Sequence, residues 1–228
     1  MQTLLFIFLN IFREWDIGTK VTQNGNRDIA VRAISRSERR AEMDNKDKDK
    51  LIRLIMERSF EKSDTPSFLL SSGKRSRYYF NLRNVTMAPE GQVLIGTLVY
   101  NKIQQLNLKP KGIGGLTMGA DPIAIATAFT SFLRGNPIEA FIIRKEPKEH
   151  GLKLQIEGNV KKNDKVIIVD DVVTTGASII KAMKISRQYG LDVLGVIVLL
   201  DRCEENGKEK IEAEGTTVHS ILTIEDFL

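Results

Sequence analysis

The chain has only one cysteine and two histidines among its 228 residues, and it has no long block of like charge. The single cysteine, Cys203, excludes an intramolecular disulfide and a metal site of the Cys-x-x-Cys type. His150 and His219 are too few for a histidine-rich metal centre. The net charge of +5 is modest and dispersed. Charge alone therefore does not predict nucleic-acid binding, and a small polyanionic substrate would be served equally well.

The sequence also lacks a run of apolar residues long enough to span a bilayer, which needs about 20. The apolar stretch within residues 3–12 is too short, and it has neither the basic flank nor the cleavage site of a signal peptide. We therefore expect a cytoplasmic protein with no membrane partner. Met43 is the expected start, with residues 1–42 a mis-assigned upstream stretch or a tail and residues 43–228 one domain. A peripheral membrane anchor in the first dozen residues is the other interpretation.

From residue 44 onward, strand-like and helix-like segments alternate. Asp44 and Asn45 are candidate caps for the first helix. We expect helices over 46–60, 89–107, 122–133 and 179–189 and from 204, and strands over 112–115, 139–144, 165–169, 192–201 and 216–222. Extended segments over 67–71 and 77–83 flank a turn, and 145–159 reads as a loop. This alternation predicts an α/β domain with a mostly parallel central sheet flanked by helices. Ligands of such sheets bind beyond the carboxyl ends of the strands, where three polar segments should meet.

One run joins a strand to a helix through unusual residues. Four β-branched residues, Val166 to Val169, predict a strand buried on both faces. Asp170 and Asp171 follow, and then the small, hydroxyl-rich stretch from Thr174 to Ser178. Free N–H groups at a helix start bind phosphate, whereas adjacent carboxylates suit the hydroxyls of a vicinal diol. The run therefore predicts a site for a ribose 5-phosphate. An ordinary turn with a solvated acid would need only one capping residue.

A second segment gathers cations on a loop of about fifteen residues, a length that is usually functional or disordered. It contains Arg144, Lys145, Lys148 and His150. Cations around a leaving diphosphate stabilise its developing charge, and His150 is placed to give a proton or a hydrogen bond to the departing oxygen. Closure of such a loop would exclude water. The segment alone fits a solvated loop equally well, but its presence beside the acidic pair favours function.

The run over 166–178 resembles the phosphoribosyl pyrophosphate motif of type I phosphoribosyltransferases. Other segments resemble the orotate phosphoribosyltransferase branch of that family. They are the loop over 144–151 with 156–158, the hood segment over 72–81, the pyrophosphate loop over 114–123, and Leu200-Asp201-Arg202. Their order and spacing agree across residues 44–228. The resemblance implies the type I fold with a small N-terminal hood.

The resemblance also implies a reaction and the residues that carry it. Orotate would receive ribose 5-phosphate from 5-phospho-α-D-ribose 1-diphosphate, giving orotidine 5′-phosphate and diphosphate. The implied catalytic residues are Arg144, Lys148, His150 and Asp171. The implied substrate-binding residues are those four with Lys145, Asp170, Val172, Val173, Thr174, Thr175, Gly176, Ala177, Ser178, Arg202, Tyr79 and Phe80. Mg²⁺ would be held mainly by the diphosphate and water. A homodimer sharing the catalytic loop between its subunits is implied as well.

Two positions depart from some family members, because Ser71 and Met118 stand where those members carry lysines. Lys74, Arg75 and Arg77 are the nearby cations that would compensate. Two alternatives stay open: transfer to a purine or another base, and a non-catalytic regulator that senses the sugar donor. A guanidinium suits the carboxylate of orotate, which favours the orotate enzyme if Arg202 contacts the base. Arg202 would otherwise pair with Glu204 or Glu205 at the surface.

Overall fold

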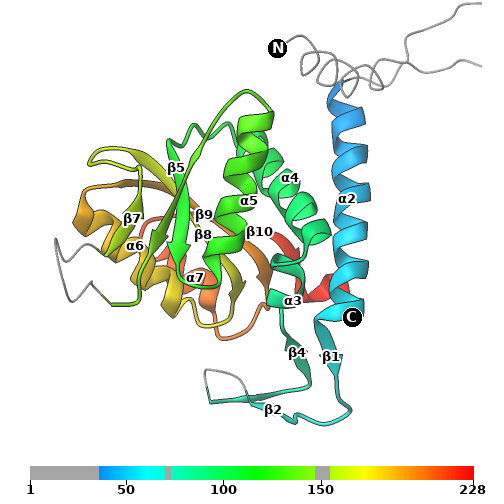
Figure 1. The fold of residues 1–228 in the computed structure, drawn as a ribbon. Helices are drawn as coiled ribbons and strands as arrows, with labels where there is room; N and C mark the ends of the chain where they lie inside the picture. Colours follow the sequence, from blue (N-terminus) through cyan, green and yellow to red (C-terminus); the bar gives the residue numbers. More distant parts are fainter. Residues whose placement is uncertain (1–35, 70–72, 147–154) are drawn as a thin grey trace, which may run out of the picture. The chain divides into compact units, whose positions relative to one another are not determined.

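A six-stranded sheet forms the centre of the molecule, with the strand order β10-β9-β8-β5-β6-β7 (Figure 1). The computed structural model describes residues 36–69, 73–146 and 155–228. The strands are β5 (Gly112–Leu116), β6 (Glu139–Ile143), β7 (Ile156–Gly158), β8 (Lys165–Val173), β9 (Asp192–Asp201) and β10 (Val218–Thr223). Neighbouring strands are parallel, except that the edge strand β7 runs antiparallel to β6. The predicted mostly parallel sheet is confirmed.

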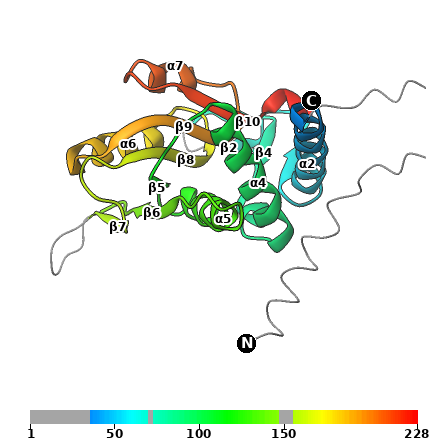
Figure 2. The same ribbon diagram turned by 90° about the horizontal axis from the view of Figure 1, so that it is seen from above.

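Helices cover both faces of this sheet (Figure 2). Along the central strand β8, Ile167 and Val169 pack into one apolar cluster, and Val166 and Ile168 pack into another. The alternation follows from the two-residue repeat of a strand, and it explains why β8 is apolar throughout its first half. The first cluster is shared with α2 (Arg36–Arg58), α4 (Pro89–Gln105) and α5 (Ala120–Leu133), the second with α6 (Ala177–Tyr189) and α7 (Gly207–Glu212).

Four short strands form the hood, which we define as residues 60–80. β1 (Phe60–Lys62) pairs antiparallel with β4 (Tyr78–Phe80), and β2 (Phe68–Leu69) pairs antiparallel with β3 (Arg75–Ser76). The predicted hairpin is therefore only partly right, because the first extended segment pairs with Arg75–Ser76, whereas the second pairs through β4 with β1. The second segment also ends at Phe80, because the short helix α3 (Arg83–Thr86) begins three residues later. The C-terminal 3₁₀ helix η2 (Ile224–Phe227) anchors the hood, since Phe227 packs 5.8 Å from Phe60 and 5.2 Å from Phe80 between ring centres.

The first helix differs most from its sequence-based bounds. α2 begins at Arg36, ten residues before the predicted start, and Asp44 does not cap it. Asp44 instead accepts hydrogen bonds from Asn101 Nδ2 at 2.6 Å and Gln105 Nε2 at 2.8 Å on α4. Arg40, one turn earlier, donates to Asn101 Oδ1 at 3.0 Å. Polar contacts with α4 therefore stabilise a segment whose sequence has few apolar residues.

Met43 lies inside α2, and its role as the start of the chain stays a prediction that an intact-mass measurement would test. Three other bounds are corrected. The acidic pair lies within β8, which extends to Val173; the segment read as a loop contains β7, paired with β6; and α7 begins at Gly207, three residues after Glu204. Within the described residues, no helix combines the length and the apolar content that crossing a membrane would need.

Candidate functional site

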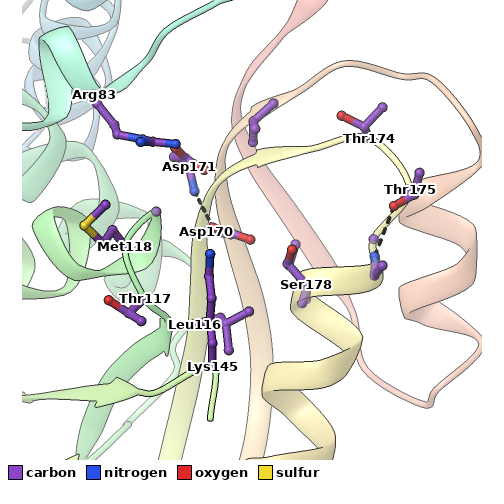
Figure 3. A pocket seen from close by; sticks show the side chains of 15 residues that line it. Arg83, Leu116, Thr117, Met118, Lys145, Asp170, Asp171, Thr174, Thr175 and Ser178 are labelled. Atoms are coloured by element: carbon purple, nitrogen blue, oxygen red, sulfur yellow. Dashed lines mark hydrogen bonds between the residues drawn. The ribbon is translucent and has the colours of Figure 1, made fainter. Parts of the chain in front are cut away.

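A cavity of about 210 Å³ opens where the parallel strands β5, β6 and β8 end (Figure 3). Its walls come from the three segments that the sequence places after these strands, so their predicted convergence is confirmed. Ile179 on α6 and Arg83 on α3 complete the lining. The other lining residues are Leu116, Thr117, Met118, Gly119, Lys145, Asp170, Asp171, Val172, Thr174, Thr175, Gly176, Ala177 and Ser178.

The acidic pair forms the floor of the cavity. Asp170 is only 7% exposed, and its Oδ1 accepts a hydrogen bond from the Asp171 backbone N–H at 3.0 Å. Burial raises the pKa of Asp170 well above its usual value, and the neighbouring charge of Asp171 raises it further. Burial also raises the pKa of Asp171. Two carboxylates held in this way are strong acceptors for hydroxyl donors, because water competes poorly for them.

The pyrophosphate-loop segment lies directly against these acids. A Cβ atom on Gly119 would stand 2.6 Å from Asp170 Oδ1 and 2.7 Å from Asp171 Oδ1, so only glycine fits without displacing them. Thr117 Oγ1 donates to Asp121 Oδ2 at 2.6 Å, and the Thr117 N–H donates to Ile143 O at 2.9 Å. The peptide bond between Thr117 and Met118 is cis. These contacts hold the backbone of the segment at the cavity.

The predicted phosphate cradle occupies the opposite wall, where β8 leads into α6. Gly176 has a φ of +76°, a conformation that favours glycine, and α6 begins at the next residue. A Cβ atom on Gly207 would stand 2.2 Å from Thr174 O, so α7 packs tightly behind the turn. The first N–H groups of a helix have no acceptor within the helix, and those of α6 border the cavity together with the hydroxyls of Thr175 and Ser178. This wall suits a phosphate.

Lys145 reaches the cavity from the end of β6, as predicted. Arg144 does not border it. The Arg144 guanidinium lies 3.8 Å from Glu157 Oε1, and its backbone N–H donates to Gln155 O at 2.8 Å. Lys148 and His150 fall outside the described residues. Of the four residues predicted to contact the diphosphate, two are described by the structure, and Lys145 is the one that borders the cavity.

Arg83 is a lining residue that the sequence interpretation missed. Its side chain points toward Asp171 (Figure 3), where its positive charge opposes the effect of burial on the Asp171 pKa. The sequence feature that could have revealed Arg83 is the spacing of Leu82 and Val85. Both side chains are buried, and they anchor a helical turn that directs Arg83 toward the cavity.

Of the cations expected to compensate for the missing lysines, Lys74 pairs with Glu205 at 2.7 Å and Arg75 donates to Ser67 O at 3.1 Å. Neither borders the cavity.

The resemblance implies that Arg202, Thr174, Tyr79 and Phe80 bind the base. Thr174 borders the cavity, whereas the other three lie beneath and on the hood. Arg202 is 4% exposed, and its guanidinium stands 5.7 Å from the centre of the Phe80 ring. Tyr79 is on the other face of β4, where it is 38% exposed and stacks on Phe68 at 5.6 Å. None of the three borders the cavity, and Val173 is buried in the core below it. Arg202 does pair with Glu204, at 3.1 Å, but in a buried position rather than at the surface.

The fold and the cavity define the class of protein. A mostly parallel sheet, an acidic pair at the end of its central strand and a small-residue turn into a helix are the features of a type I phosphoribosyltransferase, and residues 82–225 match the family model described as "Phosphoribosyl transferase domain". Comparison with known proteins narrows this class. The chain belongs to the orotate phosphoribosyltransferase family.

The relatives cover nearly the whole described region. Orotate phosphoribosyltransferase from Aquifex aeolicus is 50% identical over 182 residues, which is 80% of this chain and 98% of that protein. The enzyme from Pyrococcus horikoshii is 41% identical, over 78% of this chain and 92% of its own. The crystal structure of Mycobacterium tuberculosis orotate phosphoribosyltransferase in complex with 5-phospho-α-D-ribosyl 1-diphosphate superposes with a TM-score of 0.65. It is 29% identical, over 82% of this chain and 95% of that one.

Asp170→Asn should stabilise the fold at neutral pH. Because the folded-state pKa of Asp170 is raised, the native protein binds a proton more tightly than the unfolded chain, and stability is lost as pH rises through the folded-state pKa. An uncharged amide removes this loss. We expect a higher melting temperature for the variant at pH 7, and a difference that shrinks as the pH approaches the usual value for aspartate. Thermal unfolding at a series of pH values measures it. A melting temperature that falls at pH 7 would contradict the electrostatic assignment.

Arg83→Gln should weaken binding of a polyanionic sugar donor, because it removes one of the two cations among the described lining residues. Loss of a charge-assisted contact predicts about a tenfold rise in the KM for the donor. The acid limb of the pH–rate profile should also move to higher pH, since the charge that lowers the Asp171 pKa is gone. Arg75→Gln, on the hood and away from the cavity, is the matched control. Equal effects from both variants would refute a specific role for Arg83.

Proposed function

We propose that the chain transfers ribose 5-phosphate from 5-phospho-α-D-ribose 1-diphosphate, the sugar donor, to orotate in pyrimidine (UMP) biosynthesis. The observation that carries this proposal is one cavity, lined by two cations as well, in which an acidic pair, with Asp170 buried and Asp171 half-buried, lies opposite a helix N-terminus. The relatives named above are orotate phosphoribosyltransferases, which supports the same activity. Its location in the cytoplasm stays a prediction.

Each part of the sugar donor has a matching wall. The 5-phosphate accepts hydrogen bonds from the amides that open α6 and from Thr175 and Ser178. The ribose hydroxyls donate to Asp170 and Asp171, whose charge keeps phosphate groups off the floor. The diphosphate then lies toward Lys145 and Arg83, whose positive charges stabilise it as the bond to C1 breaks. Lys148 and His150, on the loop that follows Lys145, would complete this cationic side.

Mg²⁺ fits this arrangement as a companion of the substrate. Among the described residues, no group of three or more His, Cys, Asp or Glu side chains is placed to hold a metal ion, so a hard cation would take most of its ligands from diphosphate oxygens and water. Asp170 and Asp171 are the carboxylates of the cavity lining that could add to them. When bound, the ion would offset charge on the leaving diphosphate.

The base would approach from the hood side, where Arg202 lies under Phe80. The Arg202 N–H donates to Val173 O at 3.1 Å, which ties the arginine backbone to the residue that precedes the phosphate cradle. A guanidinium on the residue joined to Val173 in this way suits the carboxylate of orotate. A purine or another neutral base would not need it, and a non-catalytic regulator would not need the cationic loop.

The test is an absorbance assay of base consumption with the sugar donor and Mg²⁺. We expect orotate to be consumed, and uracil, hypoxanthine and adenine to react at least a hundredfold more slowly, because a site built to bind a charged group rejects analogues that lack it. Faster transfer to a purine would establish the alternative acceptor. Binding of the donor without transfer to any base would establish the regulator.

A homodimer is supported by an exposed apolar stripe on α5. Ile125, Phe129 and Phe132 recur at helical spacing on one face, and they are 52%, 66% and 70% exposed. Side chains this large are rarely left in water over a contiguous face. α5 begins one residue after Gly119, so a second copy seated on this stripe would lie beside the cavity. That position would let each subunit offer its cationic loop to the other.

Mixing two inactive variants tests the shared loop. Lys148→Ala removes a loop cation, and Asp171→Asn alters the floor of the cavity. If the loop serves the partner, each hybrid dimer has one site with both residues intact. A statistical mixture should then recover about a quarter of wild-type activity. The mixture stays inactive if each loop serves its own subunit. Adding Phe129→Asp to both chains should abolish the recovery and give monomers by light scattering.

A further inference from the structure

Arg202 is held by a carboxylate of its own chain, in the geometry that a substrate carboxylate would adopt. Its Nε donates to Glu204 Oε2 at 3.2 Å, and its Nη2 donates to Glu204 Oε1 at 3.1 Å. Two parallel N–H···O bonds of this kind form the bidentate pairing between guanidinium and carboxylate groups. The pair lies against the hood, since Nη2 also approaches Ser76 Oγ at 3.0 Å and Tyr78 O at 3.2 Å.

The donors on this edge of the guanidinium are fully committed. Nε carries one hydrogen and Nη2 carries two, and they face four acceptor atoms on Glu204, Ser76 and Tyr78. An incoming carboxylate cannot form a bidentate pair through Nη2 while Glu204 keeps both of its bonds. Substrate and Glu204 therefore compete for the same nitrogens.

Burial explains why Arg202 needs a counter-ion in the free protein. The side chain is 4% exposed, and an unpaired charge at such a depth would be strongly unfavourable. Glu204 differs, because its side chain is 30% exposed and so has a path to solvent. The backbone around it is anchored, since the Cys203 N–H donates to Asp201 Oδ1 at 2.8 Å and Glu205 pairs with Lys74 at 2.7 Å. A rotation of the Glu204 side chain alone would release the arginine.

We propose that Glu204 is an exchangeable counter-ion for Arg202, which the carboxylate of the acceptor base displaces, and that this exchange excludes neutral bases. The inference rests on the proposed function. A carboxylate substrate replaces one negative partner by another, so the buried guanidinium stays paired throughout. A neutral base would either leave Arg202 buried without a counter-charge or bind beside a Glu204 that still occupies the site. Glu204 is thus a residue that determines specificity without taking part in the chemistry.

Glu204→Gln tests the exchange, because it keeps the shape of the side chain and removes the competing charge. We expect the KM for orotate to fall about tenfold, or ~1.4 kcal/mol, with the KM for the sugar donor and kcat within about twofold of wild type. The free variant should melt at a lower temperature, since Arg202 has lost its counter-ion, and orotate should raise that temperature more than it does in the wild type. Glu209→Gln, which removes an equal charge from the exposed face of α7, should change none of these values.

A KM for orotate that is unchanged or higher in Glu204→Gln would overturn the proposal, because Glu204 would then be a fixed support for the arginine. If Glu204→Gln does not fold, Glu204→Asp supplies the same test, since its shorter carboxylate should hold Arg202 less well and lower the KM by a smaller factor. Restoration of the melting temperature in Arg202→Gln/Glu204→Gln would confirm that the pair stabilises the free protein. A wild-type protein that does not consume orotate would refute the proposed function itself, which is a different outcome from a failed exchange.

Discussion

The constraint on which the rest of the site depends is the placement of two adjacent carboxylates in the last part of β8, one buried and one half-buried. An acidic pair in this position is costly, and the raised pKa of Asp170 reflects that cost. The neighbouring segments accommodate it in different ways. Gly119 leaves room for both carboxylates, Arg83 brings a compensating charge to Asp171, and the long apolar strand before the pair supplies the packing that holds it in place. Carboxylates whose pKa is shifted in this way occur most often at functional sites.

The cavity holds two kinds of chemical group on separate walls: carboxylates, which accept hydrogen bonds from hydroxyls, and amides with hydroxyls, which donate hydrogen bonds to phosphate. Carboxylates would repel a phosphate, and amides with hydroxyls would not orient a sugar diol by themselves. By placing the acids inside β8 and the amides at the start of α6, one continuous stretch of chain presents both surfaces to one ligand. A molecule with hydroxyls between phosphate groups would satisfy both walls, so the order of the residues in this run supports the proposed binding of a phosphorylated ribose.

The parts of the structure that local sequence encodes were predictable, and the parts that depend on tertiary contacts were not. β8, its acidic pair and the helix after it follow from a β-branched run, two acids and small residues. The extent of α2 did not follow, because Arg40 and Asp44 stabilise it through hydrogen bonds to α4 that no periodicity reveals. Arg83 was missed for the same reason, since its direction depends on how α3 packs. In proteins generally, tertiary packing can override the intrinsic helix or strand propensity of a segment.

The sugar side and the base side of the site are held in place by different parts of the chain. The sugar side is built from strand ends and a helix start, whose backbone is fixed by the sheet, so Asp170, Asp171 and the cradle residues converge as the sequence predicts. The base side depends on side chains that satisfy one another when no base is present. A buried guanidinium must have a partner, and Glu204 provides it. Arg202 does not border the cavity, and its guanidinium is paired with Glu204. The proposed exchange would free this guanidinium for the carboxylate of a base without leaving it unpaired.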